Sequence, residues 1–479
     1  MLFYSGLYLG FLLLTATLFY SVKNNFKHIV LFACSLGFIT YISWEVSLYA
    51  IIFSTFNFFA GILIEKYKLN APLRRRIFWS TIALDIGFLS FFKYFGLLSG
   101  LFSGIVSAIS GNSSWSVDKL IIPLGISYYT FQALGYIIRI NRGTDKPETD
   151  YLKFVTFLIF FPKFFSGPVE RSNRFFPQIN KLGEFKKENI YEGLRLLLWG
   201  AFKKIVIATS FYMPVYQIYD NIHNYSGASL LVVFFLQTIY IYMEFSGYTD
   251  MALGSAKIFG INLIDNFNRP FLAKNVSDYW RRWHISLSSW CNDFIYSPFI
   301  VKYRKYDKVA VVSGIFLTFF TVGIWHAANW TFVVLGLLQG IAIVYEFYTK
   351  KYRLKVASSY PKSAVNTFSR IVVFLFVCVS MVLFFSPSIS DAWYFLSHLF
   401  IFDSQSTGVL NIPDKTIFGL SVLSFILIFI AEMLNEKGRN LPALFLKQPI
   451  WLRWMGYAGL LAVIYLSNSQ FLPFEYMKF

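Results

Sequence analysis

Two histidines stand where an imidazole could move protons. His284 lies in Asp-Tyr-Trp-Arg-Arg-Trp-His-Ile-Ser-Leu-Ser-Ser-Trp, residues 278–290, and His326 lies in Gly-Ile-Trp-His-Ala-Ala-Asn-Trp, residues 323–330. Because apolar runs flank His326 on both sides, its imidazole would be costly to desolvate unless it had a partner or a task. A neutral imidazole there could take a proton from a hydroxyl group or accept an acyl group. The alternative is a core histidine hydrogen-bonded to a neighbouring helix, and this feature alone leaves both open.

The segment around His284 has the pattern of an amphipathic helix. Its large apolar residues recur at helical spacing; they are Trp280, Trp283, Leu287 and Trp290. Arg281, Arg282 and Ser288 fall on other faces, so we expect one helix over residues 278–290 at the cytoplasmic membrane interface. Two guanidinium groups would lower the pKa of His284 and keep its imidazole neutral. The alternative is an aromatic-belt helix whose arginines hold lipid phosphates.

Weaker candidates lie in other segments. Asp250 ends the run Glu-Phe-Ser-Gly-Tyr-Thr-Asp, whose carboxylates and hydroxyls could orient a histidine or cap helix ends. Gln132 ends the run Pro-Leu-Gly-Ile-Ser-Tyr-Tyr-Thr-Phe-Gln, where interhelical hydrogen bonding is the ordinary use of polar groups. Beside His326, Asn329 offers an amide, and the two alanines before it leave room for a substrate.

Composition assigns the chain to the membrane. Hydrophobic residues make up 56% of its 479 residues and charged residues only 14%, whereas soluble chains carry about 25% charged residues. A net charge of +18 suits anionic lipid head groups or an anionic, phosphate-bearing substrate. Nucleic acid is the poorer partner, because the basic residues form short clusters between apolar runs. The three cysteines have no metal-ligand spacing, so we expect neither a zinc site nor a disulfide frame.

Membrane-spanning helices must position these residues. A span needs about 20 mostly apolar residues, and roughly eleven stretches qualify in whole or in part. The basic segments 65–76 and 269–308 are assigned to the cytoplasm by the positive-inside rule. Polar and helix-breaking residues interrupt residues 160–177 and 245–271, which predicts re-entrant elements that line a site. We expect one all-α, polytopic membrane domain over residues 1–479.

Several motifs follow one another in a fixed order along the chain. They occupy residues 123–132, 161–163, 166–168, 245–252, 266–271, the tryptophan-arginine segment with His284, and 323–330. This ordered set resembles the membrane-bound O-acyltransferases, specifically the bacterial branch of the alginate O-acetyltransferase membrane subunit. Relatives usually have Arg-Asp after the tryptophan-arginine segment and then paired glycines, whereas this chain has Asn292 and Asp293 and no glycine at 300–303.

The resemblance implies a membrane enzyme whose transmembrane, re-entrant and interfacial helices surround a polar funnel. Such an enzyme passes an acyl group from a cytoplasmic thioester donor, acetyl-CoA or another acyl thioester, towards an extracytoplasmic polymer. His326 matches the family's catalytic histidine, and His284 matches its second recurrent histidine. The resemblance implies no bound cofactor and no metal.

We therefore expect a multi-pass O-acetyltransferase of the cell (inner) membrane that modifies an exopolysaccharide or another cell-envelope polymer. The predicted catalytic residues are His326 and His284, and the predicted substrate-binding residues are Arg281, Arg282, Ser288, Asp293, Asn329, Trp325, Asp250 and Gln132. Expected partners are an acyl thioester donor or acyl carrier protein, an extracytoplasmic acyltransferase, a polysaccharide acceptor and membrane lipids. Two alternatives stay open. One is teichoic-acid D-alanylation from a carrier protein, and the other is a transporter or flippase, although inverted repeats are not evident.

Overall fold

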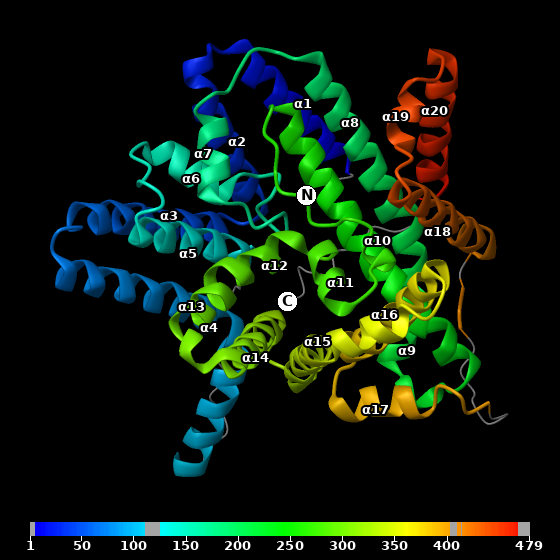
Figure 1. The fold of residues 1–479 in the computed structure, drawn as a ribbon. Coiled ribbons are helices and arrows are strands. Elements are labelled where there is room, and N and C mark those ends of the chain that lie inside the picture. Colours follow the sequence, from blue (N-terminus) through cyan, green and yellow to red (C-terminus); the bar gives the residue numbers. More distant parts are fainter. Residues whose placement is uncertain (1–4, 111–124, 403–409, 413, 468–479) are drawn as a thin grey trace. The chain divides into compact units, whose positions relative to one another are not determined.

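The described part of the chain is built from helices joined by turns and irregular segments, and it contains no strand (Figure 1). The predicted all-α fold is thereby confirmed. The computed structural model describes residues 5–110, 125–402, 410–412 and 414–467. Residues 123 and 124 of the predicted motif at 123–132 lie outside the described residues.

These helices form two compact units. Among the described residues, the first unit holds the chain up to Arg195 together with Ala252–Ile264, and the second holds Leu196–Met251 together with the chain from Asp265 to Ser467. Helices α8 (Lys187–Ala201) and α10 (Ala228–Ile258) each contribute residues to both units. The single domain over residues 1–479 stays a prediction.

The first unit contains the N-terminal helices. They are α1 (Gly6–Ser21), the 3₁₀ turn η1 (Asn24–Phe26), α2 (Lys27–Ile42), α3 (Trp44–Lys66), α4 (Ala71–Ser110), α5 (Ile126–Arg142), α6 (Tyr151–Ile159) and α7 (Ser172–Ile179). Aromatic rings fill its interior; for example, Tyr8 packs edge-on against Phe38, with ring centroids 6.0 Å apart.

The second unit contains the remaining helices. Between α8 and α10 lie η2 (Phe202–Ala208), α9 (Thr209–Asp220) and η3 (Ile222–Asn224). After α10 come η4 (Pro270–Leu272), α11 (Val276–Arg282), α12 (Ile285–Cys291), η5 (Asn292–Tyr296), α13 (Ser297–Lys302), η6 (Arg304–Tyr306), α14 (Asp307–His326), α15 (Trp330–Ala357), α16 (Lys362–Phe385), α17 (Ile389–Ser397), α18 (Lys415–Glu436), α19 (Leu441–Leu446) and α20 (Ile450–Ser467).

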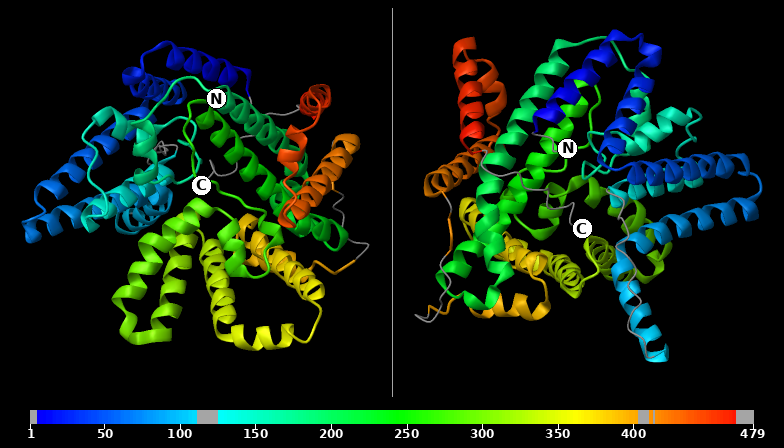
Figure 2. Two further views of the ribbon diagram at one scale, coloured as in Figure 1. Left: turned by 45° about the horizontal axis from the view of Figure 1, so that its top comes forward. Right: turned by 180° about the vertical axis from the view of Figure 1, so that it is seen from behind.

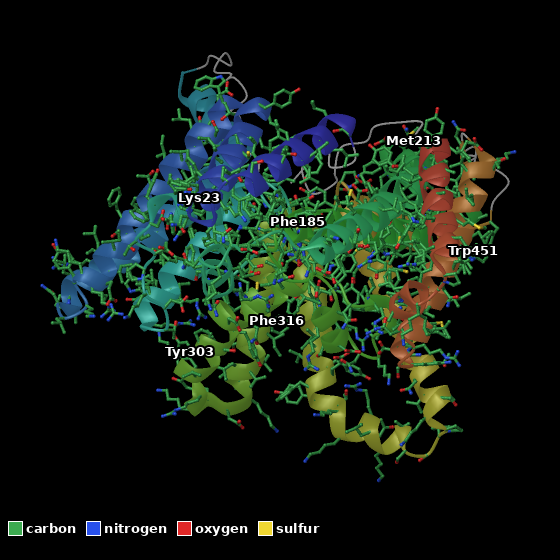
Figure 3. The ribbon with its side chains drawn as sticks, turned by 90° about the horizontal axis from the view of Figure 1, so that it is seen from above. Lys23, Phe185, Met213, Tyr303, Phe316 and Trp451 are labelled. Atoms are coloured by element: carbon green, nitrogen blue, oxygen red, sulfur yellow. The ribbon has the colours of Figure 1, made fainter. Side chains whose placement is uncertain are left out.

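Ten segments of the described chain are long and apolar enough to cross a membrane, in line with the roughly eleven expected. Their outward side chains fit lipid. On α20, for instance, Trp451 (labelled in Figure 3) is 61% exposed and Leu461 is 56% exposed. Apolar exposure on this scale would be a liability in water, whereas hydrocarbon tolerates it. The chain is a multi-pass membrane protein.

The predicted interruption after residue 160 is confirmed. Helix α6 ends at Ile159, and residues 160–171 continue as turns and extended backbone. Lys163 is fully buried in this segment and donates hydrogen bonds to the Gln132 side-chain oxygen and the Phe157 carbonyl. Glu170 is also buried and accepts from the backbone N–H of Ile264 at 2.9 Å. Backbone groups of the segment also bond inside the first unit: the Phe161 N–H donates to the Ser35 hydroxyl at 3.2 Å, and the Gly167 N–H donates to the Lys163 carbonyl at 3.1 Å.

The second predicted interruption, over residues 245–271, is wrong as far as residue 258. Helix α10 runs unbroken to Ile258. Gly247 is needed there because a Cβ at this position would lie 2.8 Å from the Gly200 carbonyl oxygen of α8. Asp250 is tolerated because the Lys203 ammonium lies 2.7 Å from its carboxylate. The polar and small residues of this run therefore serve close packing and ion pairing within an intact helix.

Helices α14 and α15 run antiparallel beside each other in the second unit (Figures 1 and 2). Glycines set their close approach. A Cβ on Gly323 would collide with the Phe332 carbonyl oxygen, and a Cβ on Gly336 would collide with the Phe319 carbonyl oxygen. Further along, the ring of Phe316, labelled in Figure 3, packs on Gly340. This packing fixes the end of α14, where His326 is the last helical residue.

Candidate active site

The tryptophan-arginine segment forms two short helices, so the prediction of one helix over residues 278–290 is wrong. Helix α11 ends at Arg282, α12 begins at Ile285, and His284 between them takes the left-handed backbone conformation with φ 45° and ψ 50°. The break aims the His284 side chain into the second unit, where it is 1% exposed. Left-handed residues other than glycine are uncommon and cluster at functional sites.

The His284 imidazole packs between two aromatic rings. Its centroid lies 4.8 Å from that of Phe245 on α10 and 6.3 Å from that of Trp325 on α14, both with steep interplanar angles. Helices α11 and α12 lie outside the ten candidate membrane-spanning segments. Burial lowers the pKa of His284 to about 3, so the imidazole is neutral at physiological pH.

The neutral state of His284 agrees with the sequence-based expectation, but its cause differs. We expected the two adjacent guanidinium groups to lower the pKa, whereas burial is the main cause. Arg282 is engaged by carboxylates: its guanidinium lies 2.9 Å from Glu436 and 3.0 Å from Asp278. Arg281 is exposed. Arg282 therefore serves an internal ion-pair network, and its predicted substrate-binding role stays a prediction.

His326 packs against the same tryptophan, Trp325. Its ring centroid lies 4.7 Å from that of Trp325, 5.7 Å from that of Phe332 on α15 and 5.9 Å from that of Phe384 on α16. The residue is 8% exposed. The two predicted catalytic histidines, which are 42 positions apart in the sequence, thus both pack on Trp325. The structure brings three predicted site residues into one cluster.

A cavity of about 1230 Å³ lies beside this cluster within the second unit. Its apolar part is lined by Trp280, Leu287, Ile315, Phe319 and Val322. Val322 stands four residues before His326 and so lies on the same face of α14, one turn away. The predicted substrate-binding residues Arg281 and Ser288 also line the cavity. The cavity therefore extends along α14 to within one helical turn of His326.

The rest of the cavity wall carries basic groups. The cationic residues are Lys274, Arg281, Lys350 and Arg353, which come from the segment before α11, from α11 itself and from the last turns of α15. Glu346 also lines the cavity, but its carboxylate accepts from the backbone N–H and the hydroxyl of Ser277, at 3.1 and 2.9 Å. These bonds cap α11 and offset much of the negative charge of Glu346. The cavity mouth suits an anionic ligand.

Two predicted binding residues serve other purposes in the structure. Asp250 pairs with Lys203, as described above. Asn329 caps α15, accepting from the Thr331 backbone N–H at 3.1 Å, and its amide donates to the Pro387 carbonyl at 2.8 Å. Their predicted roles in substrate binding stay predictions.

The remaining predicted residues lie elsewhere. Asp293 is exposed, one position after Asn292 of the cavity wall. Gln132 belongs to the first unit, where its side-chain oxygen accepts from Lys163 and its amide donates to the Tyr128 carbonyl at 3.2 Å. The cluster on Trp325 belongs to the second unit, so Gln132 is not among the residues that build it.

The sequence predicted neither that the basic end of α15 lines the cavity nor a task for Asn266. From the sequence, Lys350 and Arg353 were expected in a loop. They line the cavity because α15 continues to Ala357. Asn266 was noted within a family motif but given no task. As for metals, the described residues include no group of three histidine, cysteine or carboxylate side chains that could hold an ion.

Comparison with known proteins identifies the family. The profile of the MBOAT, membrane-bound O-acyltransferase family, matches residues 147–386, which include both histidines and the cavity's helices. The chain belongs to this family. It is a membrane O-acyltransferase, and the transporter alternative is not supported.

Three curated relatives illustrate the range of the family. "Probable alginate O-acetylase AlgI" of Azotobacter vinelandii is 27% identical over 435 residues, which cover 90% of this chain and 84% of that protein. "Peptidoglycan O-acetyltransferase" of Helicobacter pylori is 30% identical over 377 residues, covering 72% and 69%. "Teichoic acid D-alanyltransferase" of Bacillus subtilis is 32% identical over 282 residues, covering 56% and 69%.

Proposed function

We propose that the chain is an O-acetyltransferase of the cell (inner) membrane that takes its acetyl group from a cytoplasmic thioester such as acetyl-CoA. The group is destined for a hydroxyl of a cell-envelope polysaccharide. The cavity carries this proposal, because its cationic mouth suits a phosphate-bearing donor and its apolar end lies one turn from His326. Relatives named for alginate and peptidoglycan acetylation support the acetyl group and the polymer acceptor.

The orientation of α14 supports access from two sides. Its first residue, Asp307, lies at the end of the basic segment 269–308 assigned to the cytoplasm, and His326 lies about 28 Å further along the helix axis. Just beyond His326, Ala328 and Trp330 are exposed. A donor in the cavity would thus approach His326 from the cytoplasmic side, and an acceptor hydroxyl would approach from the opposite end of α14.

The reaction requires two proton transfers and one acyl transfer. The neutral His326 imidazole accepts the proton of the acceptor hydroxyl as its oxygen attacks the thioester carbonyl carbon. The tetrahedral intermediate then expels the thiolate, which receives the proton from the imidazolium. The products are an ester and a free thiol, so atoms and charge balance. A buried site favours this route because no water competes with the acceptor.

His284 and Trp325 complete the proposed site. Both imidazoles pack against the Trp325 ring, with centroid distances of 6.3 Å for His284 and 4.7 Å for His326. With its pKa lowered to about 3 by burial, His284 is a neutral hydrogen-bonding group that can orient a polar substrate atom without adding charge. Arg281, with the cavity's other cations, would hold the donor's phosphates.

The acceptor side requires a further partner. We propose that in the cell an extracytoplasmic acyltransferase receives the acetyl group and passes it to the polymer, because a long polymer outside the cell cannot enter a membrane-embedded site along its whole length. A short polysaccharide can present its own hydroxyl group to the site, so the purified protein can be assayed without this partner. Membrane lipids surround the helices that position the site.

Transfer of D-alanine from a carrier protein is the second candidate. The Bacillus subtilis relative named for teichoic acid D-alanylation favours it, at 32% identity. The two candidates differ in the donor. A carrier protein docks on the membrane protein's cytoplasmic surface and inserts a thioester arm, whereas a nucleotide-bearing thioester needs the cationic pocket itself.

The test is acyl transfer by the purified protein in detergent, where no membrane gradient exists. Acetyl-CoA or a D-alanyl carrier protein is supplied with a short polysaccharide, and free thiol is measured together with ester. We expect thiol release with acetyl-CoA. Thiol release with the carrier alone would favour the second candidate, and absence of thiol from both donors would contradict an acyltransferase.

A further inference from the structure

The backbone at His284 is held in its left-handed conformation by a neighbouring segment. Histidine pays a steric cost there that glycine would not. The conformation persists because residues 266–268 lie alongside residues 282–286 and bond to them on both sides of His284. The Asn268 N–H donates to the Arg282 carbonyl at 2.9 Å, and the Ile285 N–H donates to the Asn266 carbonyl at 3.0 Å.

Asn266 adds a side-chain bond to this pairing. Its side-chain oxygen accepts from the Ser286 N–H at 3.2 Å, so this one residue binds the first two N–H groups after His284. Both N–H groups belong to the first turn of α12 and have no partner within that helix. Asn266 is 0% exposed, which makes its hydrogen bond hard to replace with water.

Two salt bridges to one carboxylate also join these two segments. Glu436 of α18 lies 3.3 Å from the Arg269 guanidinium and 2.9 Å from that of Arg282. Arg269 is itself left-handed, with φ 52°. The two segments are therefore joined by main-chain bonds, by Asn266 and by a shared carboxylate, and the joint lies directly beside His284.

We propose that Asn266 is a positioning residue that sets the direction of the His284 imidazole for acyl transfer. It acts through the backbone, by keeping His284 left-handed so that the ring points between Phe245 and Trp325. This inference rests on the proposed function, because it takes the His284 imidazole to be part of the site.

The kinetic test compares three variants of the full-length protein in detergent. Asn266→Ala removes the acceptor for the Ser286 N–H. We expect it to lower kcat about tenfold or more, the scale of losing one buried hydrogen bond, while KM for acetyl-CoA changes far less. Asn266→Asp keeps an acceptor oxygen in place and should restore most of kcat. Asn268→Ala is the matched control, because its exposed side chain contacts Arg269 and its backbone N–H is kept.

A stability measurement tests the link to His284 without relying on activity. Glycine is left-handed at no steric cost, so in a His284→Gly background the Asn266 side chain has less strain to hold. We expect Asn266→Ala to lower Tm less in that background than in the wild type. The positioning role would be overturned if Asn266→Ala lowered Tm equally in both backgrounds. It would also be overturned if Asn266→Ala left kcat unchanged while His284→Ala was inactive. Full activity of His284→Ala would instead overturn the place of His284 in the proposed function.

Discussion

Acid should destabilise the protein through His284, and the size of the effect follows from its burial. Burial lowers the pKa of His284 from 6.5 to about 3. The unfolded chain binds a proton at this side chain below pH 6.5, and the folded chain does not until about pH 3. The stabilisation is therefore fully present above pH 6.5 and is lost as pH falls towards 3. At pH 4.5 the loss is about 3 kcal/mol, since each unit of pKa corresponds to about 1.4 kcal/mol.

The measurement compares the wild type with His284→Asn in detergent between pH 7.5 and 4.5. Asparagine tolerates the left-handed conformation and does not titrate, so the variant retains every other acid-sensitive group. We expect the wild-type free energy of unfolding, obtained from thermal melts, to fall by about 3 kcal/mol more than that of the variant. If the free energy of unfolding fell equally in the two proteins, His284 would not be a buried, neutral imidazole. Its proposed role as a neutral hydrogen-bonding group in the site would then be wrong.

Two further predictions separate binding groups from structural ones. Arg281→Ala should raise KM for acetyl-CoA and leave Tm unchanged, because Arg281 lines the cavity. Arg282→Ala should lower Tm, because Glu436 loses its bidentate partner. Steady-state kinetics and thermal melts on both variants distinguish these outcomes. Lys204→Met should destabilise by about 3–5 kcal/mol because it leaves the buried Glu244 carboxylate without this ion pair, and adding Glu244→Leu should recover most of the loss. A double variant no more stable than the single one would contradict that assignment.

The sequence predicted which residues lie together better than it predicted the backbone that carries them. His326 stood out because an ionisable group interrupts an apolar run, and that signal needs no tertiary information. The flanking apolar runs also predicted the two helices that meet at residues 326–330, which the structure confirms as α14 and α15. Trp325 was among the predicted substrate-binding residues, and it is the ring that both histidines contact.

Pairing between distant segments explains what the sequence could not predict. The helical spacing of residues 278–290 favoured one helix. The structure has two helices there because Asn266 accepts hydrogen bonds from the N–H groups of Ile285 and Ser286. Likewise, Asp250 looked like a helix breaker because Lys203, 47 positions away, could not be foreseen as its partner. Local pattern predicts that a segment is helical, whereas the places where helices break and the partners of buried charges depend on contacts that only the fold supplies.

The most direct test of the account is the rate of acyl transfer by His326→Ala. The assay follows thiol release from acetyl-CoA by monodisperse protein in detergent, with a short polysaccharide as the acceptor. His398→Ala is the control because His398 lies beyond α17, outside the site. Loss of a general base costs about 10²-fold or more, so we expect His326→Ala to fall by at least that factor. His398→Ala should keep the wild-type rate. A His326→Ala protein that releases thiol at near-normal rate would contradict the central claim that this imidazole carries the proton.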